Sequence, residues 1–143
     1  MKRATAAIAV GFFFSIQSFA QAPGTADGQW HYLGGDAAHT RYSPADQIDA
    51  DNFEDLEEAW VWNGASFSAA SGRSTPSYIN GTLYTVAGPR LHVVAMDPAS
   101  GETIWSYREP STPRWEYSMR KDYGTGIAYA EVDGRDVIYI VSP

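Results

Sequence analysis

The chain has 143 residues with 17 acidic and 10 basic side chains, and its formal charge of −7 disfavours nucleic acid or an anionic lipid surface as a partner. It contains no cysteine, which excludes disulfides, thiolate metal sites and a lipidated cysteine within this sequence. Five Trp and nine Tyr, combined with few long helical patterns, favour an all-β protein.

The first twenty residues have the pattern of an export signal. Lys2 and Arg3 precede an apolar run at 6–14, and the sequence SFA at 18–20 places small residues where a signal peptidase cleaves. An N-terminal membrane anchor is the alternative, but the apolar run is short for a bilayer span. We therefore expect residues 1–20 to be a signal peptide and the mature protein to be exported to the periplasm.

Residues 21–63 are expected to form an N-terminal segment that leads into a sheet. Within it, 46–56 predicts a short helix, because Asp51 is a suitable N-cap and acidic residues follow it in the first turn. The sequence EEAWVWN at 57–63 alternates between two faces and predicts a strand.

The stretch 73–108 reads as four short antiparallel strands joined by turns. The first two strands meet at Asn80-Gly81, a dipeptide that accepts the positive φ values of a two-residue hairpin. The last two meet at 97–101 (DPASG), where Asp, Pro and Gly each favour a turn. The expected strands are 74–79, 82–87, 91–96 and 102–108. Such a meander cannot bury both of its faces alone, so we expect neighbouring sheets of the same kind.

A second unit of this type begins near residue 124. Strands are expected at 124–131 and 136–142, and their Asp-Gly turn followed by IYIVSP matches the Asn-Gly turn followed by LYTVAGP in the first unit. The offset of about fifty residues is typical of β-propeller blades. The prediction for 64–143 is therefore one complete four-stranded blade at 73–108 and an incomplete second blade at 124–143.

The strand at 57–63 precedes the first blade and is separated from it by a Ser/Ala/Gly loop at 64–72. In closed propellers an N-terminal strand commonly completes the last blade, and we expect this role for 57–63. The chain is accordingly expected to be the N-terminal portion of a longer protein.

Three motifs resemble the pyrroloquinoline-quinone (PQQ)-dependent dehydrogenases. They are YLGGDAAHTRYSPADQI at 32–48, AMDPASGETIW at 95–105, which is similar to the tryptophan-docking repeat of that family, and GTGIAY at 124–129. The resemblance implies an eight-bladed propeller that holds PQQ with Ca²⁺ in its central funnel. It also implies oxidation of an alcohol or sugar by hydride transfer, with a cytochrome or membrane quinone as electron acceptor.

The resemblance also implies candidate cofactor-binding residues. Arg73 stands where family members often place a cofactor-contacting Glu, and Thr125 stands where they often place an Arg. A guanidinium can bind a carboxylate of the quinone through two hydrogen bonds, and Arg120 and Lys121 can approach the same anion from the loop 109–123. The alternative, in which these are solvated loop charges and a turn residue, remains open.

No catalytic residue or metal ligand is expected in this chain, because the family's catalytic Asp and calcium ligands are implied to follow residue 143. Two functional hypotheses remain. The first is an exported PQQ-dependent dehydrogenase of which this chain is one part. The alternative is a non-catalytic PQQ-like propeller that acts as a binding or assembly module, which the departures at Arg73 and Thr125 favour.

Overall fold

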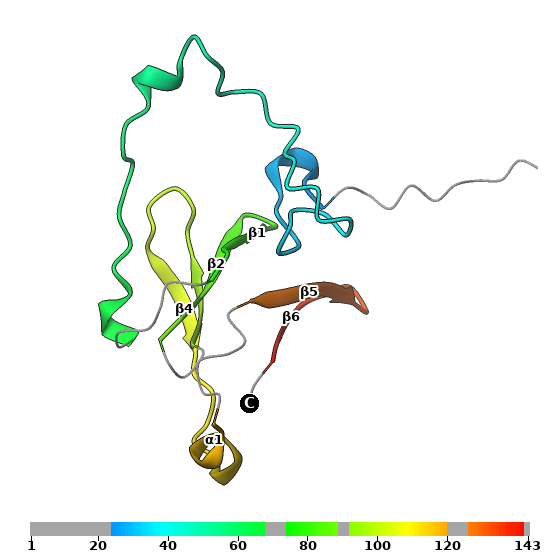
Figure 1. Ribbon diagram of the computed structural model, residues 1–143, viewed down its shortest axis with the longest axis vertical. Coiled ribbons are helices and arrows are strands. Elements are labelled where there is room, and N and C mark those ends of the chain that lie inside the picture. Colours follow the sequence, from blue (N-terminus) through cyan, green and yellow to red (C-terminus); the bar gives the residue numbers. More distant parts are fainter. Residues whose placement is uncertain (1–23, 68–73, 89–91, 120–125, 142–143) are drawn as a thin grey trace, which may run out of the picture.

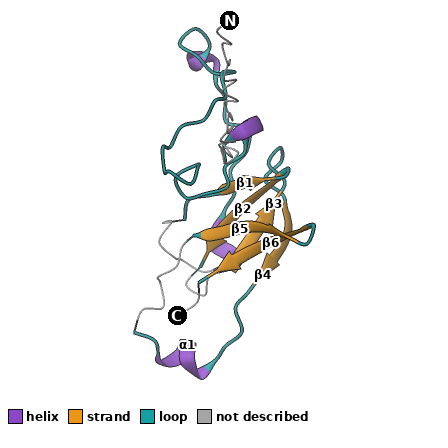
Figure 2. Ribbon diagram, turned by 90° about the vertical axis from the view of Figure 1, so that its right-hand side faces the viewer, coloured by secondary structure: helices purple, strands orange, loops and turns teal. Residues whose placement is uncertain are grey.

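The computed structural model describes residues 24–67, 74–88, 92–119 and 126–141. It contains a four-stranded antiparallel sheet in the order β1-β2-β3-β4 and a two-stranded sheet, β5-β6. The strands are β1 (Ser77–Ile79), β2 (Thr82–Ala87), β3 (His92–Met96), β4 (Thr103–Tyr107), β5 (Ile127–Val132) and β6 (Arg135–Ile140). In both overall views the β5-β6 hairpin lies beside one face of the larger sheet (Figure 1, Figure 2). The prediction of one complete blade and half of a second is confirmed.

The helices of the described ranges are all short. They are the 3₁₀ helices Ala26–Gly28, Phe53–Asp55 and Gly64–Phe67, and the α-helix α1 (Pro113–Tyr117), which projects away from both sheets (Figure 1). Within the described part of the chain, none has the length and apolar character that a bilayer crossing requires.

Strand β3 forms the centre of the core. Both Val94 and Ala95 are fully buried although they point to opposite faces of the sheet, so each face is covered. The face that carries Val94 also carries His92, whose ring lies 5.2 Å from that of Phe67. The opposite face carries Val93, which lines a cavity together with residues of β6. The first blade is therefore packed between the segment before it and the second hairpin.

The two hairpin turns have the expected backbone conformation. Asn80 and Gly81 have φ values of 47° and 81°, and Asp133 and Gly134 have values of 51° and 72°. Positive φ at both central residues characterises the two-residue turn whose twist matches that of the flanking strands. These turns set the registers Ile79↔Thr82 and Val132↔Arg135.

The turn between β3 and β4 is held by Asp97. Its Oδ1 accepts hydrogen bonds from the backbone N–H groups of Ala99, at 2.7 Å, and Ser100, at 3.0 Å. Gly101 closes the turn with a φ of 71°, and its N–H donates to the Asp97 carbonyl oxygen at 2.8 Å. The prediction for this turn is confirmed.

The short helix expected within 46–56 is present as Phe53–Asp55, but the prediction that Asp51 caps it is wrong. Asp49 Oδ1 accepts from the N–H of Asp51 at 2.8 Å and of Asn52 at 3.2 Å, while Asn52 Oδ1 accepts from the N–H of Asp49 at 2.9 Å. These reciprocal hydrogen bonds place the stabilising carboxylate at Asp49, two residues before the expected cap at Asp51.

The loop at 109–123 contains the unexpected helix α1. Thr112 Oγ1 accepts from the N–H of Trp115 at 3.2 Å, and Pro113 occupies the first helical turn. Five residues are too few to produce a hydrophobic period, so only the cap and the proline could have indicated this helix.

Residues 57–63 form no regular strand within the described part of the chain. They run beside the first blade, where Trp60 Nε1 donates to the Pro98 carbonyl oxygen at 3.0 Å and Trp62 Nε1 donates to Thr103 Oγ1 at 3.4 Å. The ring-closing role of this segment stays a prediction.

Candidate functional site

The four sequence-predicted cofactor residues lie outside the described residues. Arg73, Arg120, Lys121 and Thr125 therefore stay predictions. The described residues that adjoin them in sequence are Ser74, Met119 and Gly126. Among the described side chains, no group of three or more His, Cys, Asp or Glu residues could hold a metal ion.

A hollow beside the beginning of the first blade has the cationic residue Arg41 in its lining. It has a volume of about 510 Å³ and is lined by Trp30, Leu33, Arg41 and Thr75. Trp30 reaches this position because its N–H donates to the carbonyl oxygen of Tyr78 in β1 at 2.8 Å. The guanidinium, the hydroxyl and the indole ring are together suited to binding a carboxylate attached to a planar or apolar group.

The loop that presents Arg41 is held by its own hydrogen bonds. Asp36 accepts from the Thr40 N–H at 3.0 Å and from Thr40 Oγ1 at 2.5 Å, and the Arg41 N–H donates to the Gly34 carbonyl oxygen at 2.9 Å. The side-chain hydrogen bond from Thr40 lowers the pKa of Asp36 below its usual value. His39 and Arg41 both have a φ of 57°, which is uncommon for residues other than glycine.

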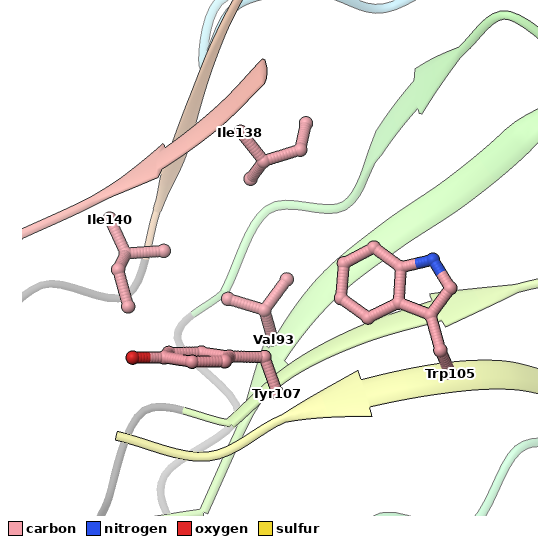
Figure 3. A pocket seen from close by; sticks show the side chains of 5 residues that line it. All are labelled: Val93, Trp105, Tyr107, Ile138 and Ile140. Atoms are coloured by element: carbon pink, nitrogen blue, oxygen red, sulfur yellow. The ribbon is translucent and has the colours of Figure 1, made fainter. Parts of the chain in front are cut away.

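A second cavity, of about 280 Å³, separates the two sheets (Figure 3). Val93, Trp105 and Tyr107 of the first blade face Ile138 and Ile140 of β6 across it. Its lining is mainly apolar, and the only polar side-chain groups among these five residues are the Tyr107 hydroxyl and the Trp105 indole N–H. We interpret this cavity as a packing space between the two sheets.

Sequence reasoning did not identify a polar cluster at the β1-β2 turn. Asn80, Tyr129 and Asp136 are mutually hydrogen-bonded there, and the ring of His31 lies 5.1 Å from that of Tyr129. His31 reads as an isolated histidine in the sequence, and Asn80 as a turn residue. No local signal links them, because the contacts join segments that are about fifty to about a hundred residues apart.

The comparisons with known proteins agree with the fold. Residues 30–141 match the family model described as "PQQ: Glucose/ethanol/alcohol dehydrogenase, beta-propeller domain". A "1-butanol dehydrogenase (cytochrome c)" of Thauera butanivorans is 39% identical over 89 residues, which are 62% of this chain and 12% of that protein. A "quinohemoprotein alcohol dehydrogenase" of Comamonas testosteroni is 40% identical over 78 residues, 54% of this chain and 11% of that protein.

Two solved structures resemble this chain. The crystal structure of the quinohemoprotein alcohol dehydrogenase from Comamonas testosteroni has a TM-score of 0.61 at 31% identity and covers 82% of this chain and 18% of its own. A europium-containing methanol dehydrogenase has a TM-score of 0.62 at 25% identity, covering 80% of this chain and 19% of its own. The chain thus spans less than a fifth of these relatives. It belongs to the family of PQQ-dependent glucose, ethanol and alcohol dehydrogenases and forms part of their β-propeller domain.

Proposed function

We propose that this chain is the N-terminal part of an exported PQQ-dependent dehydrogenase that oxidises an alcohol or sugar. The observation that carries the proposal is the family match over 30–141, which includes both the complete blade and the second hairpin. Relatives named as alcohol dehydrogenases support an alcohol substrate, and a relative named as a glucose dehydrogenase supports a sugar. The signal pattern of residues 1–20 supports export to the periplasm.

When bound, the quinone supplies the hydride acceptor, and the protein supplies binding and orientation. Arg73 and Thr125 are the residues of this chain that we propose bind the quinone, with Arg120 and Lys121 adding positive charge. The hollow lined by Arg41 and Thr75 supports an anionic ligand near the beginning of the first blade, because Arg41 is cationic. We propose Ca²⁺ as the metal and place its ligands in other blades. We therefore assign no residue of this chain a role in metal binding.

The electron acceptor is proposed to be a cytochrome or a membrane quinone. The relative from Thauera butanivorans carries cytochrome c in its name, and other relatives are named as quinone-linked alcohol dehydrogenases. Both kinds of acceptor fit an enzyme that works outside the cytoplasm.

The test is equilibrium binding of PQQ, with Ca²⁺ present, to the full-length protein. Micromolar or tighter binding is expected, and Arg73→Gln is expected to weaken it about tenfold, since a charge-assisted pair with a carboxylate is lost. Arg114→Gln removes an exposed arginine of α1 and is the matched control, with wild-type affinity expected. A full-length protein that does not bind PQQ at micromolar concentration contradicts the enzyme and favours the non-catalytic binding or assembly module.

A further inference from the structure

Three segments that are distant in sequence meet at the turn between β1 and β2. Asn80 Nδ2 lies 3.2 Å from Tyr129 Oη and 3.1 Å from Asp136 Oδ1, and Tyr129 Oη donates to Asp136 Oδ1 at 2.7 Å. The backbone N–H of Asn80 donates to Gln29 Oε1 at 2.9 Å. The turn of the first blade is thus bound both by the N-terminal segment and by the hairpin of the second blade.

The N-terminal segment makes further contacts on each side of this turn. The His31 ring packs edge-on against Tyr129, with ring centroids 5.1 Å apart, and its Nε2 lies 3.3 Å from Gln29 Oε1. The Trp30 N–H binds the carbonyl oxygen of Tyr78. Residues 29–31 therefore contact β1 and β5 at once.

These contacts are not a repeating feature of blade packing. When the two hairpin turns are aligned, the residue of the first blade that corresponds to Asp136 is Leu83, and the one that corresponds to Tyr129 is Pro76. Neither can form the same hydrogen bonds. The first blade therefore does not repeat the side chains with which the second hairpin forms this cluster.

We propose that Asn80, Tyr129 and Asp136, together with residues 29–31, form a joint that fixes β5 against β1 and thereby positions the cofactor site. Away from this joint, a cavity of about 280 Å³ lies between the two sheets, where Trp105 and Tyr107 of β4 face Ile138 and Ile140 of β6 (Figure 3). The starts of β1 and β5 follow positions 73 and 125 closely in the sequence. The effect on the cofactor rests on the proposed function, whereas the joint itself does not.

The ionisable side chains of the joint, Asp136 and Tyr129, make its stability depend on pH. The hydrogen bonds from Tyr129 and then Asn80 lower the pKa of Asp136 below 3.8, and the bond to Asp136 raises the pKa of Tyr129 above 10.0, with Glu131 adding a smaller effect. Stability from the carboxylate is present above pH 3.8 and is lost as the pH falls through its folded-state pKa. Stability from the phenol is present below pH 10.0 and is lost as the pH rises through its folded-state pKa.

His31 adds a smaller dependence near neutral pH. Burial lowers its pKa below 6.5, and the negative charge of Asp136 partly offsets this effect. Its contribution is therefore present above pH 6.5 and decreases as the pH falls below that value.

The joint is tested by hydrogen exchange in the full-length protein without added cofactor. In Tyr129→Phe, exchange of residues 24–35 is expected to accelerate about fivefold, because a side-chain hydrogen bond on β5 is lost. Tyr139→Phe removes the hydroxyl of a half-exposed tyrosine in β6 of the same hairpin and is expected to leave that exchange unchanged. Asp136→Asn retains an acceptor for Tyr129 and is expected to exchange like the wild type at pH 7. It is also expected to lack the acceleration that we expect of the wild type as the pH falls below 3.8. Unchanged exchange in Tyr129→Phe overturns the proposal.

A second measurement separates positioning from stability alone. PQQ affinity of the full-length protein is expected to fall severalfold in Tyr129→Phe, to remain unchanged in Tyr139→Phe and to be retained in Asp136→Asn. Accelerated exchange with unchanged PQQ affinity overturns the positioning role and leaves a structural joint. Absence of PQQ binding in the wild type refutes the proposed function. The joint is then tested only by whether exchange of residues 24–35 accelerates in Tyr129→Phe.

Discussion

The full-length protein with Val94→Asp is expected to fail to fold. Val94 is fully buried at the centre of β3, and packing of further blades can only retain or increase that burial. The cross-strand partners of Val94 are Thr85 and Ser106, whose hydroxyls cannot neutralise a carboxylate. A charge buried at this position therefore costs about 4 kcal/mol or more, a large share of the stability of a domain. The measurement is the soluble yield and the far-ultraviolet circular dichroism of the variant.

Val94→Thr serves as the control of matched shape. It places a hydroxyl where a methyl group stands and is expected to lower the free energy of unfolding by about 1–3 kcal/mol while preserving the fold. Urea denaturation of the full-length protein measures this loss. If Val94→Asp folded with wild-type stability, β3 could not be the core strand of the first blade.

Gly101→Ala is expected to weaken the packing of the segment 57–63 on the first blade. A Cβ atom at Gly101 would lie 2.5 Å from Cε3 of Trp60, and its φ of 71° is unfavourable for alanine. The two effects together are expected to cost about 2–5 kcal/mol, through backbone strain of about 1–2 and overpacking of about 1–3. Urea denaturation of the full-length protein provides the measurement.

Gly134→Ala separates the two contributions. Gly134 has nearly the same φ, 72°, but a Cβ atom there would meet nothing within 4 Å. Its cost is expected to be the backbone strain alone, about 1–2 kcal/mol. A shorter side chain in Trp60→Leu is expected to recover part of the loss in Gly101→Ala. Equal losses for the two glycine variants would mean that Trp60 does not pack on this turn.

The local elements could largely be predicted from the sequence. The turns at Asn80-Gly81 and Asp133-Gly134 determine their hairpins because few dipeptides accept two consecutive positive φ values. The turn held by Asp49 and the helix α1 were missed, since several acidic residues compete for such hydrogen bonds and a five-residue helix has no period. Interactions between residues close in sequence account both for the turns that were predicted and for the elements that were missed.

The candidate site was less accessible to sequence reasoning. Arg73 and Thr125 were identified through motif positions rather than through their surroundings, and they stay predictions. Arg41 was part of a motif at 32–48, but only the folded chain brings it beside Thr75 to form a hollow. The signal that could have indicated Arg41 was a cation among aromatic residues, which is too common to be specific.

The sequence by itself determined the repeat of the blade, the turns and the family, because turn chemistry, strand period and motif spacing all act over a few residues. Only the tertiary structure decided that His31, Asn80 and Asp136 share one joint and that Trp60 packs on Gly101. Each of these contacts spans about forty residues or more, and the energy of a side chain in such a contact depends on its partners. Those partners are set by how the sheets pack, which no local pattern contains.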